Sequence, residues 1–168
     1  MKFCSAPWDT IAIQSDGEVT SCLCGDWNTA GNIGNLLHTP LSEIMRSDPV
    51  DRLRDTVGDQ SFSMCRDQCP QKWMLDTVDT LPTPRVALPT TILLAIDYEC
   101  NLRCASCRSS RIWTGLVNPT AMRILDTLTL AYKDHDQPVT LQCDGAGDVF
   151  ASAAWNEFLS RESLPGCF

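Results

Sequence analysis

Hydrophobic and polar positions alternate in two short runs near the start of the chain. TIAIQ (residues 10–14) and EVTSC (residues 18–22) flank the tripeptide SDG. Gly17 in that tripeptide can adopt the positive φ that a tight turn between two strands requires. The pattern therefore predicts a β-hairpin.

Two short amphipathic helices are predicted after the hairpin, each marked by a cap residue and a proline. In TPLSEIMRS, Thr39 is the expected N-cap and Pro40 the first helical residue. In SDPVDRLRDTVG, Pro49 begins the helix after a cap at Ser47 or Asp48. The expected apolar stripe of this second helix consists of Val50, Leu53 and Val57.

The second half of the chain alternates between strand patterns and helix patterns. A β-rich apolar run at 91–97 precedes a helix capped by Asn118, and the strand PVTLQC precedes the amphipathic segment SAAWNEFLSRE. The expected buried face of the first helix consists of Met122, Ile124, Leu125, Leu128 and Tyr132. A βαβα order predicts parallel strands and an α/β fold.

A proline-rich segment separates these two parts. DTLPTPRVALPT contains three prolines and suits a semi-rigid extended linker. The predicted organisation is a small α+β module at 1–80, a linker at 81–90 and two βα units at 91–168.

Composition narrows the possible settings for such a chain. The 168 residues are 43% hydrophobic, yet no apolar run approaches the ~20 residues that span a bilayer. The N-terminus lacks the apolar stretch of a signal peptide, so a cytoplasmic location and no membrane partner are expected. A formal net charge of −8 argues against nucleic-acid binding.

Ten cysteines are an unusual content for a protein in a reducing compartment, where clustered cysteines mostly bind metals or do redox chemistry. Cys100, Cys104 and Cys107 follow directly on the strand predicted at 91–97. Three thiolates can hold three irons of a cubane cluster and leave the fourth iron open. The alternative is a zinc site with Cys143 or another residue as the fourth ligand.

The C-x3-C-x2-C spacing of CNLRCASC, on a loop between a strand and a helix, resembles the signature of the radical S-adenosylmethionine (radical SAM) enzymes. The resemblance implies a [4Fe-4S] cluster held by Cys100, Cys104 and Cys107, with S-adenosylmethionine on the open iron. One electron from that cluster would cleave S-adenosylmethionine and form a 5′-deoxyadenosyl radical that abstracts hydrogen from a substrate. The implied fold is the N-terminal part of the family's (βα)6 partial barrel.

The loop DGAGDVF resembles the family's second cofactor segment, which contacts the amino group of S-adenosylmethionine. By this resemblance the cofactor-binding positions are Gly145, Ala146, Gly147 and Asp148. Val149 stands where the family usually has proline.

In the first module, Cys4 and Cys22 lie on either side of Gly17. Further along, Cys65 and Cys69 form a C-x3-C pair that is followed by a proline. This pattern resembles the SPASM or twitch modules, which bind auxiliary iron-sulfur clusters. The expected ligands of one auxiliary [4Fe-4S] cluster are Cys4, Cys22, Cys65 and Cys69, with Cys24 as a possible substitute for Cys22. A zinc site on the same four residues is the alternative.

The resemblance extends to partners. Relatives with auxiliary clusters often modify peptides or proteins, and a flavodoxin or ferredoxin is the expected electron donor. The chain holds two of about six expected βα units, so a fragment, a truncated gene or a half that assembles with another chain is expected. The competing hypothesis is a non-catalytic zinc or iron-sulfur module that serves structure or electron transfer.

Overall fold

The computed structural model describes residues 1–168 apart from 24, 74, 80–87, 108, 144–146 and 162–168. The strands are β1 (Lys2–Phe3), β2 (Thr10–Gln14), β3 (Glu18–Ser21), β4 (Asn32–Asn35), β5 (Asp76–Thr77), β6 (Thr91–Ala95) and β7 (Thr140–Gln142). The α-helices are α1 (Ala6–Asp9), α2 (Leu41–Ile44), α3 (Asp48–Gly58), α4 (Pro119–Tyr132) and α5 (Ala153–Leu159), and the 3-10 helices are η1 (Gly25–Trp27) and η2 (Pro70–Trp73).

The predicted hairpin is present as the antiparallel pair β2 and β3, in which Ala12 lies opposite Thr20. Gly17 has a φ of 83°, as the turn prediction requires. A Cβ at this position would also lie 2.7 Å from Leu37 Cγ, so no larger residue fits there without a shift. β4 adds to the outer side of β3 and extends the hairpin to three strands.

A single five-stranded sheet, in the order β4-β3-β2-β6-β7, joins the two predicted modules. β2 pairs in parallel with β6 over its whole length, from Thr10 opposite Thr91 to Gln14 opposite Ala95. β6 and β7 are also parallel, as the βαβα order predicts. The sequence pattern gave no indication of the pairing between β2 and β6.

The predicted start of α4 is confirmed, whereas the starts of α2 and α3 each differ by one residue. Pro49 was predicted to begin α3, but the helix begins at Asp48. Asn118 caps α4 by accepting hydrogen bonds from the backbone N–H groups of Thr120 and Ala121, and Ser47 precedes α3. The prediction for α2 was wrong by one residue, because Pro40 is the N-cap and the helix begins at Leu41. Pro40 has an extended backbone (ψ 140°), and its carbonyl accepts the first bonds of the helix, so it cannot itself be the first helical residue.

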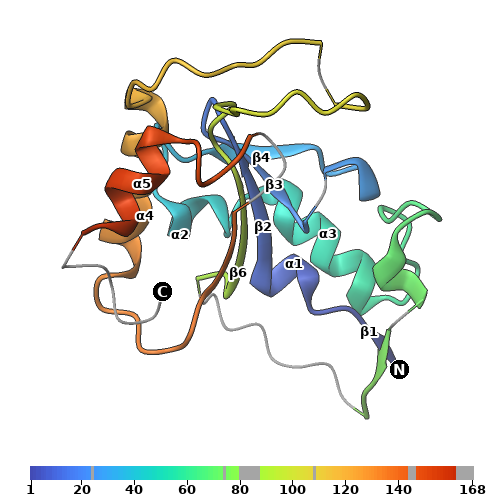
Figure 1. The fold of residues 1–168 in the computed structure, drawn as a ribbon. Coiled ribbons are helices and arrows are strands. Elements are labelled where there is room, and N and C mark those ends of the chain that lie inside the picture. The colour runs from blue at the N-terminus through green and yellow to red at the C-terminus, as the bar shows by residue number, and fades with distance from the viewer. Residues whose placement is uncertain (24, 74, 80–87, 108, 144–146, 162–168) are drawn as a thin grey trace.

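Helices cover both sides of the sheet, with α4 and α5 on one side and α1 and α3 on the other (Figure 1). The main core contains side chains from both predicted modules, including Ile11 and Ile13 of β2 and Ile92 and Leu94 of β6. The predicted buried faces are confirmed, since Val50, Leu53 and Val57 of α3 and Met122, Ile124, Leu125, Leu128 and Tyr132 of α4 are all buried. Within the described part of the chain, no helix is both long enough and apolar enough to cross a membrane.

Candidate metal centres

Four cysteines from distant parts of the first eighty residues line one small pocket. Cys22 and Cys69 are buried, and Cys4 and Cys65 are half-buried. Cys4 precedes α1, Cys22 follows β3, and the remaining two lie between α3 and η2. The fold therefore brings together the four residues that the sequence predicted as one ligand set.

Backbone hydrogen bonds hold the loop that carries Cys65 against the segment around η1. Cys65 forms a β-bridge with Asn28, and the Arg66 N–H donates to the carbonyl of Trp27 at 2.9 Å. The Cys69 N–H in turn donates to the Arg66 carbonyl at 3.1 Å. These bonds place the C-x3-C pair beside the hairpin.

The hairpin presents Cys22 through an unusual backbone conformation. Cys22 has a φ of 67°, in the left-handed region that residues other than glycine rarely adopt. Its N–H donates to the Thr10 carbonyl at 2.9 Å and so keeps it tied to β2. The chain thus turns out of β3 at the residue whose thiol lines the pocket.

A buried arginine on α3 holds the segment that follows Cys4. Arg54 is 7% exposed and donates from Nε to the Pro7 carbonyl at 3.1 Å and from Nη1 to the Met45 carbonyl at 2.8 Å. Its guanidinium also lies over the Trp8 ring, 5.7 Å from the ring centre. Arg54 therefore fixes α1, and with it the position of Cys4, against α3.

Cys4, Cys22 and Cys65 are poor acids in this pocket. Burial is the main cause that raises the pKa of Cys4 to about 11 and that of Cys22 to about 12, and the nearby thiols raise both values further. Burial also raises the pKa of Cys65, and Lys72 opposes that rise. A bound metal would supply the positive charge that lets such thiols ionise, and its binding would release protons.

A pocket lined by four thiols can hold a single metal ion or a cluster. Among the described residues, no three His, Cys, Asp or Glu side chains come close enough together to hold one ion. A tetrahedral zinc site, with Zn–S bonds of about 2.3 Å, brings its sulfurs to about 3.8 Å from one another. In a cubane cluster each thiolate binds a different iron, so the sulfurs lie farther apart. Both groups take four thiolate ligands, so the residues that line this pocket fit either one.

The three-cysteine loop lies at the carboxyl end of β6. Cys100 is half-buried, whereas Cys104 and Cys107 are exposed. The Cys100 N–H donates to the Ile112 carbonyl at 2.6 Å, and the Cys107 N–H donates to the Cys104 carbonyl at 3.1 Å. Figure 1 shows this segment, in yellow, arching over that end of the sheet before it enters α4.

Asp97, a buried residue that the sequence analysis missed, connects three elements at this edge. Its carboxylate accepts a hydrogen bond from Ser152 Oγ, the cap of α5, at 2.5 Å, and one from Asn118 Nδ2, the cap of α4, at 3.4 Å. Its position just after β6 and three residues before Cys100 was the available signal. An acidic residue that ends a central strand can bond to the helix starts beside it.

Glu99 holds the far end of the cysteine loop. Its carboxylate accepts from Thr114 Oγ1 at 2.7 Å, from the Thr114 N–H at 2.9 Å and from the Gly115 N–H at 3.3 Å. Burial raises the pKa of Glu99, but these three donors together outweigh it, and the net shift is downward. Glu99 was also missed by the sequence analysis.

The second predicted cofactor loop packs directly against the first. Gly147 touches the backbone there, since a Cβ on it would lie 2.3 Å from the Glu99 carbonyl oxygen and 2.7 Å from that of Asp97. The Asp148 N–H donates to the Glu99 carbonyl at 2.8 Å. Of the four predicted positions, Gly145 and Ala146 lie outside the described residues, as does Cys24, so their roles stay predictions.

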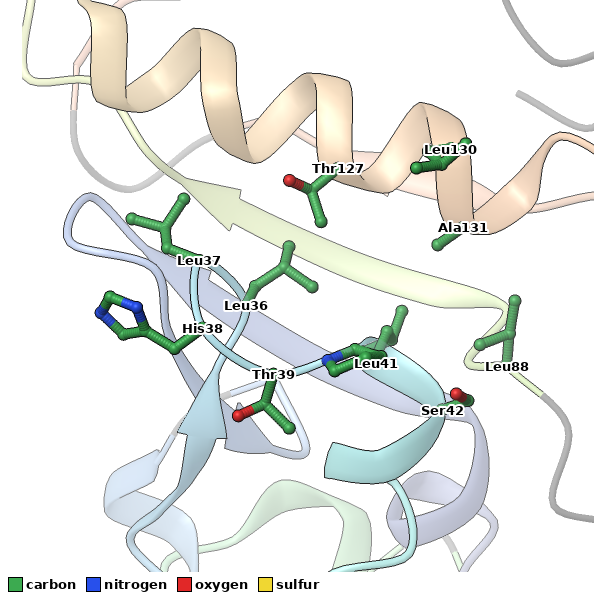
Figure 2. A pocket seen from close by; sticks show the side chains of 11 residues that line it. Leu36, Leu37, His38, Thr39, Leu41, Ser42, Leu88, Thr127, Leu130 and Ala131 are labelled. Atoms are coloured by element: carbon green, nitrogen blue, oxygen red, sulfur yellow. The ribbon is translucent and has the colours of Figure 1, made fainter.

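A separate cavity of about 480 Å³ lies between α4 and the connection from β4 to α2 (Figure 2). It is lined by Leu36, Leu37, His38, Thr39, Pro40, Leu41, Ser42, Leu88, Thr127, Leu130 and Ala131. None of the described cysteines lines it, so it is distinct from both candidate metal centres.

Comparison with known protein families supports iron-sulfur binding in the first part of the chain. The SPASM family, described as an iron-sulfur cluster-binding domain, matches residues 4–70. The matched stretch begins at Cys4, includes Cys22 and Cys65, and ends just after Cys69. No curated protein and no solved structure matches the chain.

Proposed function

We propose that this chain is a radical SAM protein with two [4Fe-4S] clusters. Cys100, Cys104 and Cys107 hold the cluster that binds S-adenosylmethionine, and Cys4, Cys22, Cys65 and Cys69 hold the auxiliary cluster. When bound, the first cluster supplies one electron for cleavage of S-adenosylmethionine to methionine and a 5′-deoxyadenosyl radical, which takes hydrogen from the substrate.

The observation that supports this most strongly is the junction at the carboxyl end of β6. The C-x3-C-x2-C loop leaves the sheet there, and Gly147 and Asp148 of the second loop pack on Asp97 and Glu99. Ligands of parallel α/β proteins bind at this edge of the sheet. The SPASM match at residues 4–70 adds support, because SPASM domains occur in radical SAM enzymes.

The residues of the chain itself would position the two loops that hold the reactants. Asp97 ties the strand end to the starts of α4 and α5, and Glu99 restrains the loop at Thr114 and Gly115. Gly147 lets the second loop approach the first closely. The Asp148 carboxylate is the group proposed to pair with the ammonium of S-adenosylmethionine.

The remaining partners follow from the same proposal. A flavodoxin or ferredoxin would supply electrons, and a peptide or protein would be the substrate. A cytoplasmic location suits the protein, because the reducing cytoplasm keeps cysteines available as ligands.

Anaerobic reconstitution with iron and sulfide tests the proposal. We expect about eight irons per chain and an EPR signal of the reduced protein that changes when S-adenosylmethionine is added. Cys104→Ala is expected to abolish that change and to leave about four irons at the auxiliary site. Cys65→Ala is expected to lower the iron content and to keep the response to S-adenosylmethionine.

Cys143→Ala is the control for these variants, because Cys143 is half-buried, belongs to neither proposed cluster and is a ligand only in the alternative zinc site. This variant should bind as much iron as the parent protein and respond to S-adenosylmethionine in the same way. Incorporation of zinc in place of iron, or an EPR signal indifferent to S-adenosylmethionine, would contradict the proposal and favour a non-catalytic metal-binding module.

A further inference from the structure

One lysine lies at the four-cysteine pocket. Lys72 belongs to η2, the turn that follows Cys69, and its N–H donates to the Cys69 carbonyl at 3.1 Å. Lys72 lines the pocket together with all four cysteines. Among the described residues that line this pocket, Lys72 is the one that carries a charge.

Lys72 brings a positive charge to the pocket that the four cysteines line. A lysine ammonium is protonated at neutral pH, because its ordinary pKa is about 10.4. A cation at this place favours negative charge in the pocket.

Asp67 holds the ammonium group from the solvent side. Lys72 Nζ lies 2.9 Å from Asp67 Oδ1, and the Asp67 side chain is 95% exposed. An exposed ion pair of this kind contributes only about 0–1 kcal/mol to stability. Stability alone is therefore a weak explanation for a cation held at this place.

We propose that Lys72 sets the reduction potential of the auxiliary cluster by stabilising its reduced form. Reduction transfers one electron from a low-potential donor to the cluster and breaks no bond, so it adds one negative charge to the pocket. A fixed cation beside the thiolates stabilises that added charge and raises the potential. Asp67 partly offsets the cation and lowers the potential. This inference rests on the proposed auxiliary cluster.

The test is a potentiometric titration of the full chain, followed by EPR. All variants carry Cys104→Ala, so that the response to S-adenosylmethionine is absent and the auxiliary signal can be followed. Lys72→Met and Lys72→Gln are expected to lower the midpoint potential, and Lys72→Arg to keep it near the parent value. Asp67→Asn is expected to raise it.

The opposite signs separate an electrostatic role from a structural one. Lys72→Met and Asp67→Asn both break the same ion pair, so a purely structural effect would move the potential in the same direction in both. Lys133→Met is the matched control, because Lys133 pairs with the neighbouring Asp134 and does not line the pocket.

Two results would overturn the inference while the cluster itself stands: no shift for Lys72→Met beyond that of Lys133→Met, or shifts of one sign for both partners of the pair. A chain that loads no iron at the auxiliary cysteines would instead remove the proposed cluster, and the role of Lys72 with it. Iron content, measured on each variant before the titration, distinguishes these cases.

Discussion

Cys22 shows what a single residue contributes at the proposed auxiliary site. A non-glycine residue in the left-handed region costs about 1–2 kcal/mol. Cys22 adopts this conformation, with a φ of 67°, where the hairpin ends and its thiol enters the pocket. The spacing of cysteines around Gly17 indicated that Cys22 is a ligand, but no local pattern predicted its strained backbone.

The thiols of the two predicted sites should differ in reactivity in the metal-free protein. At pH 8, we expect iodoacetamide to modify the exposed Cys104 and Cys107 well before the buried Cys22 and Cys69. Iodoacetamide attacks thiolates, and the pKa of Cys22 is raised to about 12. Mass spectrometry of peptides after timed labelling provides the measurement.

The raised pKa also fixes the direction of a pH effect. Cys22 is protonated in both states below the ordinary thiol pKa of 9.0, but above it the unfolded chain ionises first. The metal-free protein should therefore lose stability as the pH rises from 9.0 toward about 12.

For the iodoacetamide experiment, labelling of the protein unfolded in urea serves as the control. Equal labelling rates for all cysteines in the native protein would contradict the burial of Cys22.

At the scale of elements, α3 organises the first part of the chain through Arg54. Its apolar stripe was predictable from the helical period, because Val50, Leu53 and Val57 recur at that spacing. The burial of Arg54 was not predictable, since a charged residue beside such a stripe is usually solvated. Only the position of α1 places the carbonyl of Pro7 within reach of its guanidinium.

Replacement of this arginine should loosen α1. Arg54→Met removes two bonds to backbone carbonyls and leaves those carbonyls without their buried donor. We expect the free energy of unfolding to fall by about 2 kcal/mol, measured by urea denaturation. Arg52→Met, on the exposed side of the same helix, should change it by less than about 0.5 kcal/mol. Equal effects of the two substitutions would argue against the role of Arg54.

At the scale of the whole molecule, the sheet runs across the predicted boundary between modules. β2 and β6 pair over five residues, and the main core draws on both sides of the linker. The sequence indicated two modules because cysteines and prolines are grouped along the chain. Strand pairing across more than seventy intervening residues leaves no local trace in the sequence, so it could not be predicted from the pattern.

The shared sheet predicts cooperative unfolding of the metal-free protein. Cys22 follows β3 and Cys143 follows β7. Their labelling therefore reports on the strands that flank the paired β2 and β6 in the sheet. We expect brief alkylation at increasing urea concentrations to give the same midpoint for both cysteines, and far-UV circular dichroism to agree with them. Two separate midpoints would show that the modules unfold independently.

The sequence by itself determined the local parts of this protein. The hairpin at Gly17, the helix cap at Asn118 and the buried helix faces follow from turn chemistry and periodicity, which act over a few residues. For α3 the sequence left the cap open between Ser47 and Asp48, and the structure has Ser47. The cysteine spacings were sufficient to choose both proposed ligand sets.

Only the tertiary structure decided how these parts meet. It pairs β2 with β6, gathers Cys4, Cys22, Cys65 and Cys69 in one pocket, and places Lys72 beside them. It also packs Gly147 onto the backbone before Cys100. The physical reason is that such contacts join residues far apart in the chain, and the packing that selects them is spread over the whole core.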